Sequence, residues 1–284
     1  MEGTFSGLDL QAFTKRVYEN YLYQSTFYNF LNPAYIGELR QTGAPVIEVG
    51  SQNPTQAHIR ATKEIETALD PALITYGHVM VDLTQLNLDY AIRVPLMVTG
   101  SDITNAVQEA IDNQDAANAE AIDVYGYGKL AANADIEEVE WNPATKEEYI
   151  ELLNALKAKL FNKKVIGEYR LGIGATEYGK LVSALTTILK FETPEGVRGV
   201  TMGEVASVYG IGYVFEINDN VLNGEIGYFF NPRAVVGDTF FSAFVQTSSD
   251  IRYPGYYCLS GTQSFGAEVV KPQGIIRLVE EVSA

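Results

Sequence analysis

The sequence predicts a mixed α+β fold, with a long amphipathic helix near the middle of the chain and a β-rich C-terminal third. A helical apolar stripe runs from about residue 103 to 125, and strand-like segments dominate from about residue 197 onward. The 284 residues are 46% hydrophobic and 11% aromatic, which is typical of globular proteins. This length favours one large domain or two closely joined ones.

The overall composition excludes several classes of protein. A formal net charge of −16 argues against a protein that coats nucleic acid. One Cys and two His exclude a disulfide scaffold and a thiolate zinc site. No apolar run approaches the roughly 18 residues that span a bilayer, and the first residues lack a signal-peptide pattern. We expect a soluble, acidic protein made in a reducing compartment.

The N-terminal segment, residues 8–31, has the apolar spacing of a helix that ends at Asn32-Pro33. Its aromatic side chains lie on more than one face of that helix. One interpretation is a helix buried in its own core. The interpretation that we favour is an arm that packs on a neighbouring subunit, because aromatic residues are enriched among interface anchors. The aromatic residues are Phe13, Tyr18, Tyr21, Tyr23, Phe27, Tyr28 and Phe30.

Residues 37–78 are interrupted by Gly and Pro and contain short alternating stretches, a pattern that predicts a long two-stranded excursion. A segment of this length without apolar residues for its own core is usually functional or leans on another surface.

The long helix is predicted from Ser101 or Asp102, which offer N-caps, to Gly126 and Gly128, which mark its end. It lies in the acidic part of the chain: residues 64–140 contain 15 acidic and two basic residues. We expect it to lie under a sheet with one apolar stripe and one acidic face. The acidic side chains of that face are Glu109, Asp112, Asp115, Glu120 and Asp123.

Further helices are predicted over residues 144–161 and 176–189. Strands are predicted over residues 197–208, 210–217, 224–230, 240–247 and 266–279. Asn223-Gly224 lies between two apolar runs and predicts a hairpin.

No motif supports an enzyme. Gly174–Lys180 fits GxxxxGK, but Leu181 stands where a phosphate loop needs Ser or Thr, and Glu177 would repel phosphate. A strand-to-helix turn is the simpler interpretation. The carboxylates of the long helix lack the nearby His of a carboxylate metal site. Cys258 is most simply interpreted as a buried apolar side chain. We expect no catalytic residue, no cofactor and no metal.

The order of these elements resembles the major capsid proteins of tailed bacteriophages, which have the Hong Kong 97 fold. Local stretches that carry the resemblance are Ala121–Leu130 at the end of the long helix, Tyr169–Gly174 with the following Glu-Tyr-Gly-Lys-Leu, Gly199–Phe215, and Ser264–Leu278. The resemblance implies an N-terminal arm (1–36), an extended loop (37–78), a peripheral domain (79–141 and 260–284) with a long spine helix, and an axial domain (142–259).

The resemblance further implies a protein that assembles with itself, as hexamers and pentamers, into a closed icosahedral shell around double-stranded DNA. It would reside in the virion and assemble in the host cytoplasm. Intersubunit contacts are expected at Phe13, Tyr21 and Phe27 of the arm and at Arg40, Arg60 and Lys63 of the loop.

The partners that the resemblance implies are a separate scaffolding protein, a portal and a decoration protein, with no membrane. The spine helix would turn Glu109, Asp112, Glu120 and Asp123 toward the packaged DNA, which it would repel without specific binding. Two alternatives are an encapsulin-type nanocompartment shell and, from another class, a nucleotide-binding enzyme that uses Gly174–Lys180.

Overall fold

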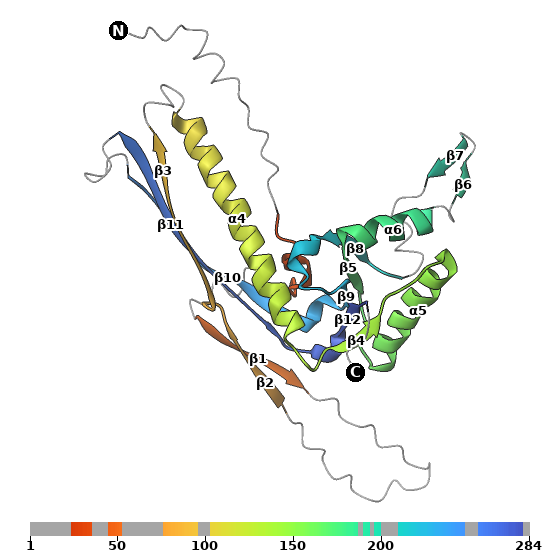
Figure 1. The fold of residues 1–284 in the computed structure, drawn as a ribbon. Coiled ribbons are helices and arrows are strands. Elements are labelled where there is room, and N and C mark those ends of the chain that lie inside the picture. The colour runs from red at the N-terminus through yellow and green to blue at the C-terminus, as the bar shows by residue number, and fades with distance from the viewer. Residues whose placement is uncertain are drawn as a thin grey trace, which may run out of the picture.

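The computed structural model describes residues 24–35, 45–52, 76–95, 103–186, 190–193, 196–199, 210–247 and 255–280. Their strands form a three-stranded sheet, a five-stranded sheet and two antiparallel pairs (Figure 1). The small pair joins β6 (Lys190–Thr193) to β7 (Gly196–Gly199).

The three-stranded sheet carries the long helix on one face. Its order is β10 (Val235–Thr247), β11 (Tyr256–Val269) and β3 (Leu86–Pro95), all antiparallel. Helix α4 (Ile103–Ala131) runs beside β3 and β11 (Figure 1). Along β3, polar residues such as Asp89 and Arg93 are exposed, whereas Leu86 and Leu88 are partly buried against the core. This alternation is what a sheet with one covered face requires.

The five-stranded sheet is covered on both faces. Its order is β4 (Glu137–Glu140), β12 (Ile275–Val279), β9 (Gly227–Phe230), β5 (Arg170–Gly174) and β8 (Tyr213–Ile217). Helices α5 (Lys146–Asn162) and α6 (Ala175–Thr186) contribute to the core on one face, where Leu156 and Phe229 are fully buried. The other face meets the end of α4 and the short 3₁₀ helix η1 (Phe27–Phe30).

Helix α5 begins where the sequence predicts. Thr145 accepts a hydrogen bond from the Glu148 amide, and the Glu148 carboxylate accepts one from the Thr145 amide. This reciprocal capping box satisfies two amides that the first turn would otherwise leave without partners.

The predicted two-stranded excursion is present as an antiparallel pair of β1 (Val46–Gln52) and β2 (Tyr76–Asp82). Val49 and Val81 of this pair are buried against Val236 and Val270. The opposite face leaves Val46 and Met80 exposed at 42% and 59%. The pair therefore joins the body of the protein through one face and presents apolar side chains on the other.

Three local predictions are wrong. Residues 24–31 contain a short 3₁₀ helix and no α-helix. Gly126 and Gly128 lie inside α4, which continues to Ala131. The predicted strand over residues 266–279 is two strands, separated by the 3₁₀ turn η4 (Pro272–Gly274).

The hairpin predicted at Asn223-Gly224 is also wrong, although the turn itself forms. Both residues have positive φ, 51° and 95°, the geometry that this dipeptide favours. The flanking strands do not pair with each other, because β5 lies between β8 and β9. The 3₁₀ turn η2 (Asp219–Val221) precedes the Asn-Gly turn and separates the two strands.

Both large sheets contain strands from each of the two expected domains, peripheral and axial. The domain boundaries themselves remain a prediction. Strand β10, placed by the resemblance in the axial part, pairs with β11 in the sheet that contains β3. Strands β4 and β12, placed in the peripheral part, lie in the same sheet as β5 and β8.

Candidate functional site

The described part of the predicted arm is built into the centre of its own chain. Phe30 is fully buried and stacks on Phe230 at a centroid distance of 3.8 Å, and Tyr127 and Tyr228 meet it edge-on. Phe27 is 1% exposed and packs edge-on against Tyr127. Aromatic pairs of this kind contribute about 0.5–1.5 kcal/mol each beyond burial.

These contacts correct the expectation for Phe27. A side chain that is 1% exposed in the single chain has no surface left for a neighbouring subunit. For Phe27, therefore, the other interpretation is correct: the segment packs in the core of its own chain. The other predicted contact residues, Phe13, Tyr21, Arg40, Arg60 and Lys63, lie outside the described residues.

Asp123 of α4 anchors this segment. Its Oδ1 accepts hydrogen bonds from the Phe27 amide (2.9 Å) and from Ser25 Oγ (2.5 Å). Its Oδ2 accepts from the Thr26 amide (3.0 Å) and from Thr26 Oγ1 (2.9 Å). The carboxylate is fully buried, and amide donors of this kind are what a buried carboxylate requires.

The sequence predicted Asp123 on the acidic outer face of the helix, and this prediction is wrong because Asp123 is fully buried. Its position on the helix places it against the N-terminal segment, and that segment supplies the donors that water would have supplied. The sequence carries a trace of this arrangement, because Ser25-Thr26 directly precedes the aromatic residues and resembles a helix N-cap.

Close packing against Phe27 explains why α4 has a glycine at position 126, one turn after Asp123. A Cβ at Gly126 would fall onto the ring of Phe27, whereas one at Gly128 would meet only the Asn223 side chain at 3.9 Å. The residue that looked like a helix end serves close packing instead.

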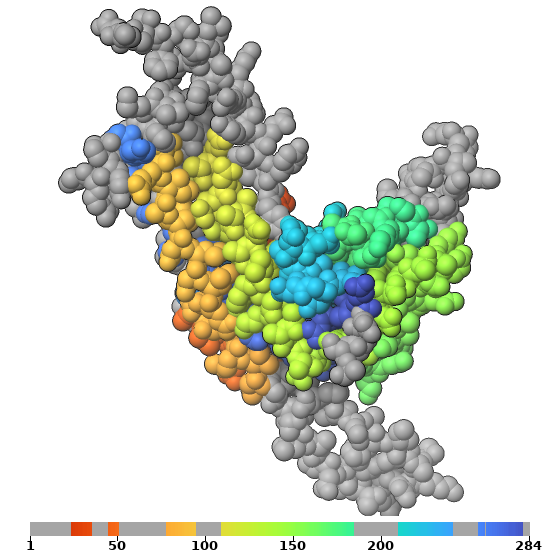
Figure 2. All heavy atoms as spheres, viewed as in Figure 1, coloured from red at the N-terminus to blue at the C-terminus, as the bar shows by residue number. Residues whose placement is uncertain are grey.

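The remaining acids of α4 differ in exposure. Glu120 is exposed, and Glu109 and Asp112 are partly exposed. Asp115, one turn from Asp112, is exposed as well, and partial desolvation together with the Asp112 charge raises its pKa. Figure 2 shows α4 as a long strip at the surface between the two sheets. The acidic face is thus narrower than expected, since Asp123 is not part of it.

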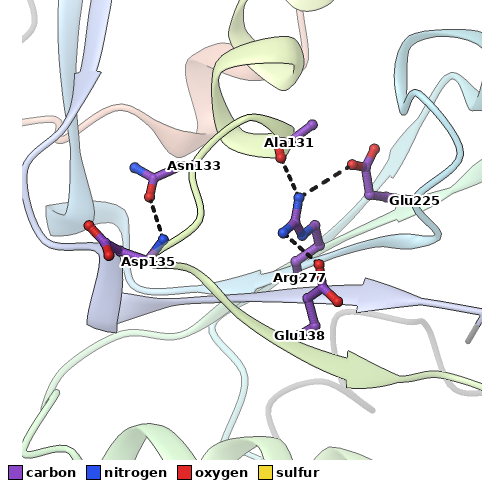
Figure 3. A network of polar contacts seen from close by, with 6 residues as sticks. All are labelled: Ala131, Asn133, Asp135, Glu138, Glu225 and Arg277. Carbon is purple, nitrogen blue, oxygen red and sulfur yellow. Dashed lines mark hydrogen bonds and ion pairs between the residues drawn. The ribbon is translucent and has the colours of Figure 1, made fainter. Parts of the chain in front are cut away.

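A polar cluster joins the end of α4 to the five-stranded sheet (Figure 3). The Arg277 guanidinium of β12 donates to the Ala131 carbonyl at the last residue of α4 and pairs with Glu138 of β4 at 2.6 Å. Glu225 lies 3.8 Å from the same guanidinium. The side chains of Arg277 and Glu225 are only 12% and 10% exposed, and burial raises the pKa of Glu225.

The Gly174–Lys180 segment is a direct strand-to-helix connection, as the simpler interpretation predicted. Strand β5 ends at Gly174 and α6 begins at Ala175. The Asp219 carboxylate accepts hydrogen bonds from the Thr176 amide (3.2 Å) and from Thr176 Oγ1 (2.6 Å). A carboxylate therefore occupies the helix N-terminus that a nucleotide phosphate would need, and Lys180 pairs with Glu177.

The described residues contain no group of three His, Cys, Asp or Glu side chains that could hold a metal ion. Among the helices that the structure describes, none combines the length and apolarity needed to cross a membrane. His78 pairs with Glu48 across β1 and β2 at 2.8 Å, and both side chains are more than half exposed.

The fold is similar to solved structures of phage particles. A structure from Mycobacterium phage Che8 matches with a TM-score of 0.60 and 14% identity, covering 93% of this chain and 94% of the other. The capsid structure of cyanophage P-SCSP1u matches with a TM-score of 0.59 and 16% identity, over 84% of each chain.

A virus-like particle from Pyrococcus furiosus matches with a TM-score of 0.55 and 10% identity, over 85% of this chain and 94% of the other. No protein-family model and no curated protein sequence matches the chain. At these identities the likeness concerns the fold, and the chain has the fold of phage capsid proteins.

Proposed function

We propose that this protein is the major capsid protein of a tailed bacteriophage, with the Hong Kong 97 fold, and that its shell encloses a double-stranded DNA genome. The observation that carries the proposal is the fold similarity to phage particle structures over 93% of the chain. The long helix against a three-stranded sheet and the protruding β1–β2 pair support the same conclusion. A capsid protein of this kind would be located in the virion.

The chain would act by association. Each subunit would lay its loop and arm across its neighbours, and many modest contacts would add up over a closed symmetric lattice. The contact residues that we propose are Phe13 and Tyr21 of the arm and Arg40, Arg60 and Lys63 of the loop. Val46 and Met80 on the exposed face of the β1–β2 pair are further candidates, because they are large apolar side chains in solvent.

The exposed acids of α4 would face the packaged DNA. Glu109, Asp112 and Glu120 would repel the phosphate backbone, so that the genome could slide during packaging and ejection. The triple reversal to Lys should slow packaging or release. Unchanged packaging and release by the triple variant would contradict this assignment.

The alternative from the same fold is an encapsulin-type nanocompartment shell. It is supported by the similarity to the Pyrococcus furiosus virus-like particle. The two proposals differ in the content of the particles, which is DNA for a capsid and a cargo protein for a nanocompartment. A separate scaffolding protein and a portal are partners that we expect only for the capsid, and a decoration protein would also fit the capsid alone.

The test is to express the chain alone and with a candidate scaffold, and to examine it by negative-stain electron microscopy and sedimentation. We expect closed shells or capsomer-sized rings in at least one condition. Nuclease-protected DNA in particles from infected cells would support the capsid, whereas a co-purifying enzyme would support the nanocompartment. A monomer in both conditions would count against both proposals.

A further inference from the structure

Helix α5 has one exposed face along its whole length. Its buried side chains belong to the core over the five-stranded sheet, and the helix itself lies at one edge of the molecule (Figure 1). On the opposite side, exposed residues recur at intervals of three and four, which places them on one face of the helix. This outer face includes Glu147, Glu151, Asn154, Ala158 and Phe161.

The charges along α5 are sorted by sign. Glu147 and Glu151 lie in its first half, and neither belongs to an ion pair among the described residues. Lys159 and Lys163 lie at its end, and both contact the Glu137 carboxylate, at 2.7 and 2.5 Å. One carboxylate balances only one of the two ammonium groups, so this end keeps a positive charge. Such an order of charges also suits the helix's own macrodipole, so the charges alone identify no partner.

The packing at the two ends of α5 supplies a second, independent observation. Phe161 and Ile166, at its C-terminal end, are 62% and 70% exposed, more than any other large apolar side chain of the described residues. Aromatic side chains in such positions are typical of interface anchors. An open hollow of about 930 Å³ lies at the N-terminal end, between α5 and α6. Its lining includes Pro143, Ala144, Lys146, Tyr149 and Ala184.

Phe161 and the hollow lie toward the same side of α5. Lys146, which lines the hollow, precedes Phe161 by 15 residues. At 3.6 residues per turn the two positions differ by only about 60° around the helix. Each copy of the chain therefore carries an exposed aromatic side chain at one end of α5 and a place for such a side chain at the other end.

We propose that α5 packs against α5 of a second copy, antiparallel about a twofold axis near Ala155. Glu147 of one copy then faces Lys163 of the other. Glu151 likewise faces Lys159, because both pairs are centred on position 155. Every contact occurs twice in such an interface, and the small side chain of Ala155 lets the two helices approach closely. A parallel pair would place like charges opposite each other.

The same arrangement places Phe161 in the hollow. A twofold axis between the helices, at right angles to both, exchanges their ends and keeps each side of α5 on the same side of the interface. Phe161 of one copy then comes level with Tyr149 of the other, and Tyr149 lines the hollow. The charges and the apolar contact thus favour the same orientation, with the charges excluding the parallel one.

Disulfide formation at the axis tests the proposal. In a Cys258→Ser background, Ala155→Cys is compared with Glu147→Cys, also an exposed residue of α5. Two copies of residue 155 would lie within disulfide reach, about 6 Å between Cα atoms. Two copies of residue 147 would be roughly 24 Å apart along the helices. We expect the full chain to form disulfide dimers at least about tenfold faster with Ala155→Cys. Equal rates, or no dimer with Ala155→Cys, would overturn the proposal.

A charge exchange provides the second arm. One variant combines Glu147→Lys with Glu151→Lys, and the other combines Lys159→Glu with Lys163→Glu. Each alone should dimerise at least about tenfold more weakly in sedimentation. An equimolar mixture should dimerise again, because every charge then meets its opposite, and this recovery also shows that both variants fold. Unweakened dimers, or folded variants that do not recover when mixed, would overturn the proposal.

The apolar contact has its own matched pair of variants. Phe161→Ser should weaken the dimer, whereas Val124→Ser, which changes a 49% exposed side chain of α4, should not; equal effects would count against the seat of Phe161. The proposal goes beyond the proposed function, because two copies suffice and no shell is required. Dimers through α5 without shells would support it and count against the capsid, and shells without the link at residue 155 would do the reverse.

Discussion

Replacing Asp123 by Ala should detach the N-terminal segment from α4 and lower the free energy of unfolding by roughly 3–6 kcal/mol. The estimate follows from the backbone donors. The amides of Thr26 and Phe27 lie 3.0 and 2.9 Å from the carboxylate, and a hydrogen bond to a charged group contributes about 1.5–3 kcal/mol. The Thr26 hydroxyl adds little to the cost, because Thr26 Oγ1 also lies 2.8 Å from the Tyr127 hydroxyl and can keep that bond.

The measurement is urea unfolding of the unassembled chain, followed by far-UV circular dichroism. Glu120→Ala is the matched control, since Glu120 is an exposed acid of the same helix and such changes usually stay within about 0.5 kcal/mol. Asp123→Asn should fall between the two, because its amide keeps one acceptor oxygen and turns a donor toward the donors of residues 25–27. If Asp123→Ala and Glu120→Ala differ by less than about 1 kcal/mol, the carboxylate does not anchor the segment and the reasoning is refuted.

Three further predictions concern packing, pH and the α6 N-terminus. Gly126→Ala should destabilise the fold by about 1–3 kcal/mol through overpacking against Phe27, whereas Gly128→Ala in the same helix should be neutral or slightly stabilising; thermal unfolding compares them. Burial raises the pKa of Glu225 in the folded state, so the folded state binds more protons than the unfolded state in this pH range. The free energy of unfolding therefore falls as pH rises from about 4.5 through the raised pKa. Glu225→Gln should reduce the dependence of the unfolding free energy on pH. An unchanged dependence would mean that other groups cause it. Asp219→Ala should cost about 1 kcal/mol, as loss of a helix cap does, and calorimetry should detect no ATP binding by either protein; tight binding abolished by Lys180→Ala would contradict this.

Features determined by neighbouring residues could be predicted from the sequence. Helix α5 begins at its Thr145–Glu148 capping box, and the body of α4 follows its apolar stripe. The Gly174–Lys180 segment could be rejected as a phosphate loop on its own composition. In each case the residues that decide the structure lie within one or two turns of each other.

Features determined by distant residues could not be predicted. Gly126 looks like a helix end until the Phe27 ring is known to lie on it. Asp123 looks like one more surface acid until Thr26 and Phe27 supply its donors. Asn223-Gly224 makes the expected turn, but whether the flanking strands pair depends on β5, about fifty residues earlier.

The seat of the N-terminal segment has a consequence for when the protein becomes competent to bind its neighbours. The segment is synthesised first, yet Phe27 packs against Phe265, and the Asn32 amide donates to the carbonyl of Val235. Its binding place is therefore complete only after β11 has left the ribosome. Contacts between the two ends of a chain form late, since long loops must close first. An unfinished or truncated chain would lack a fixed base for its arm, so only full-length subunits could offer the arm to a partner in a defined direction.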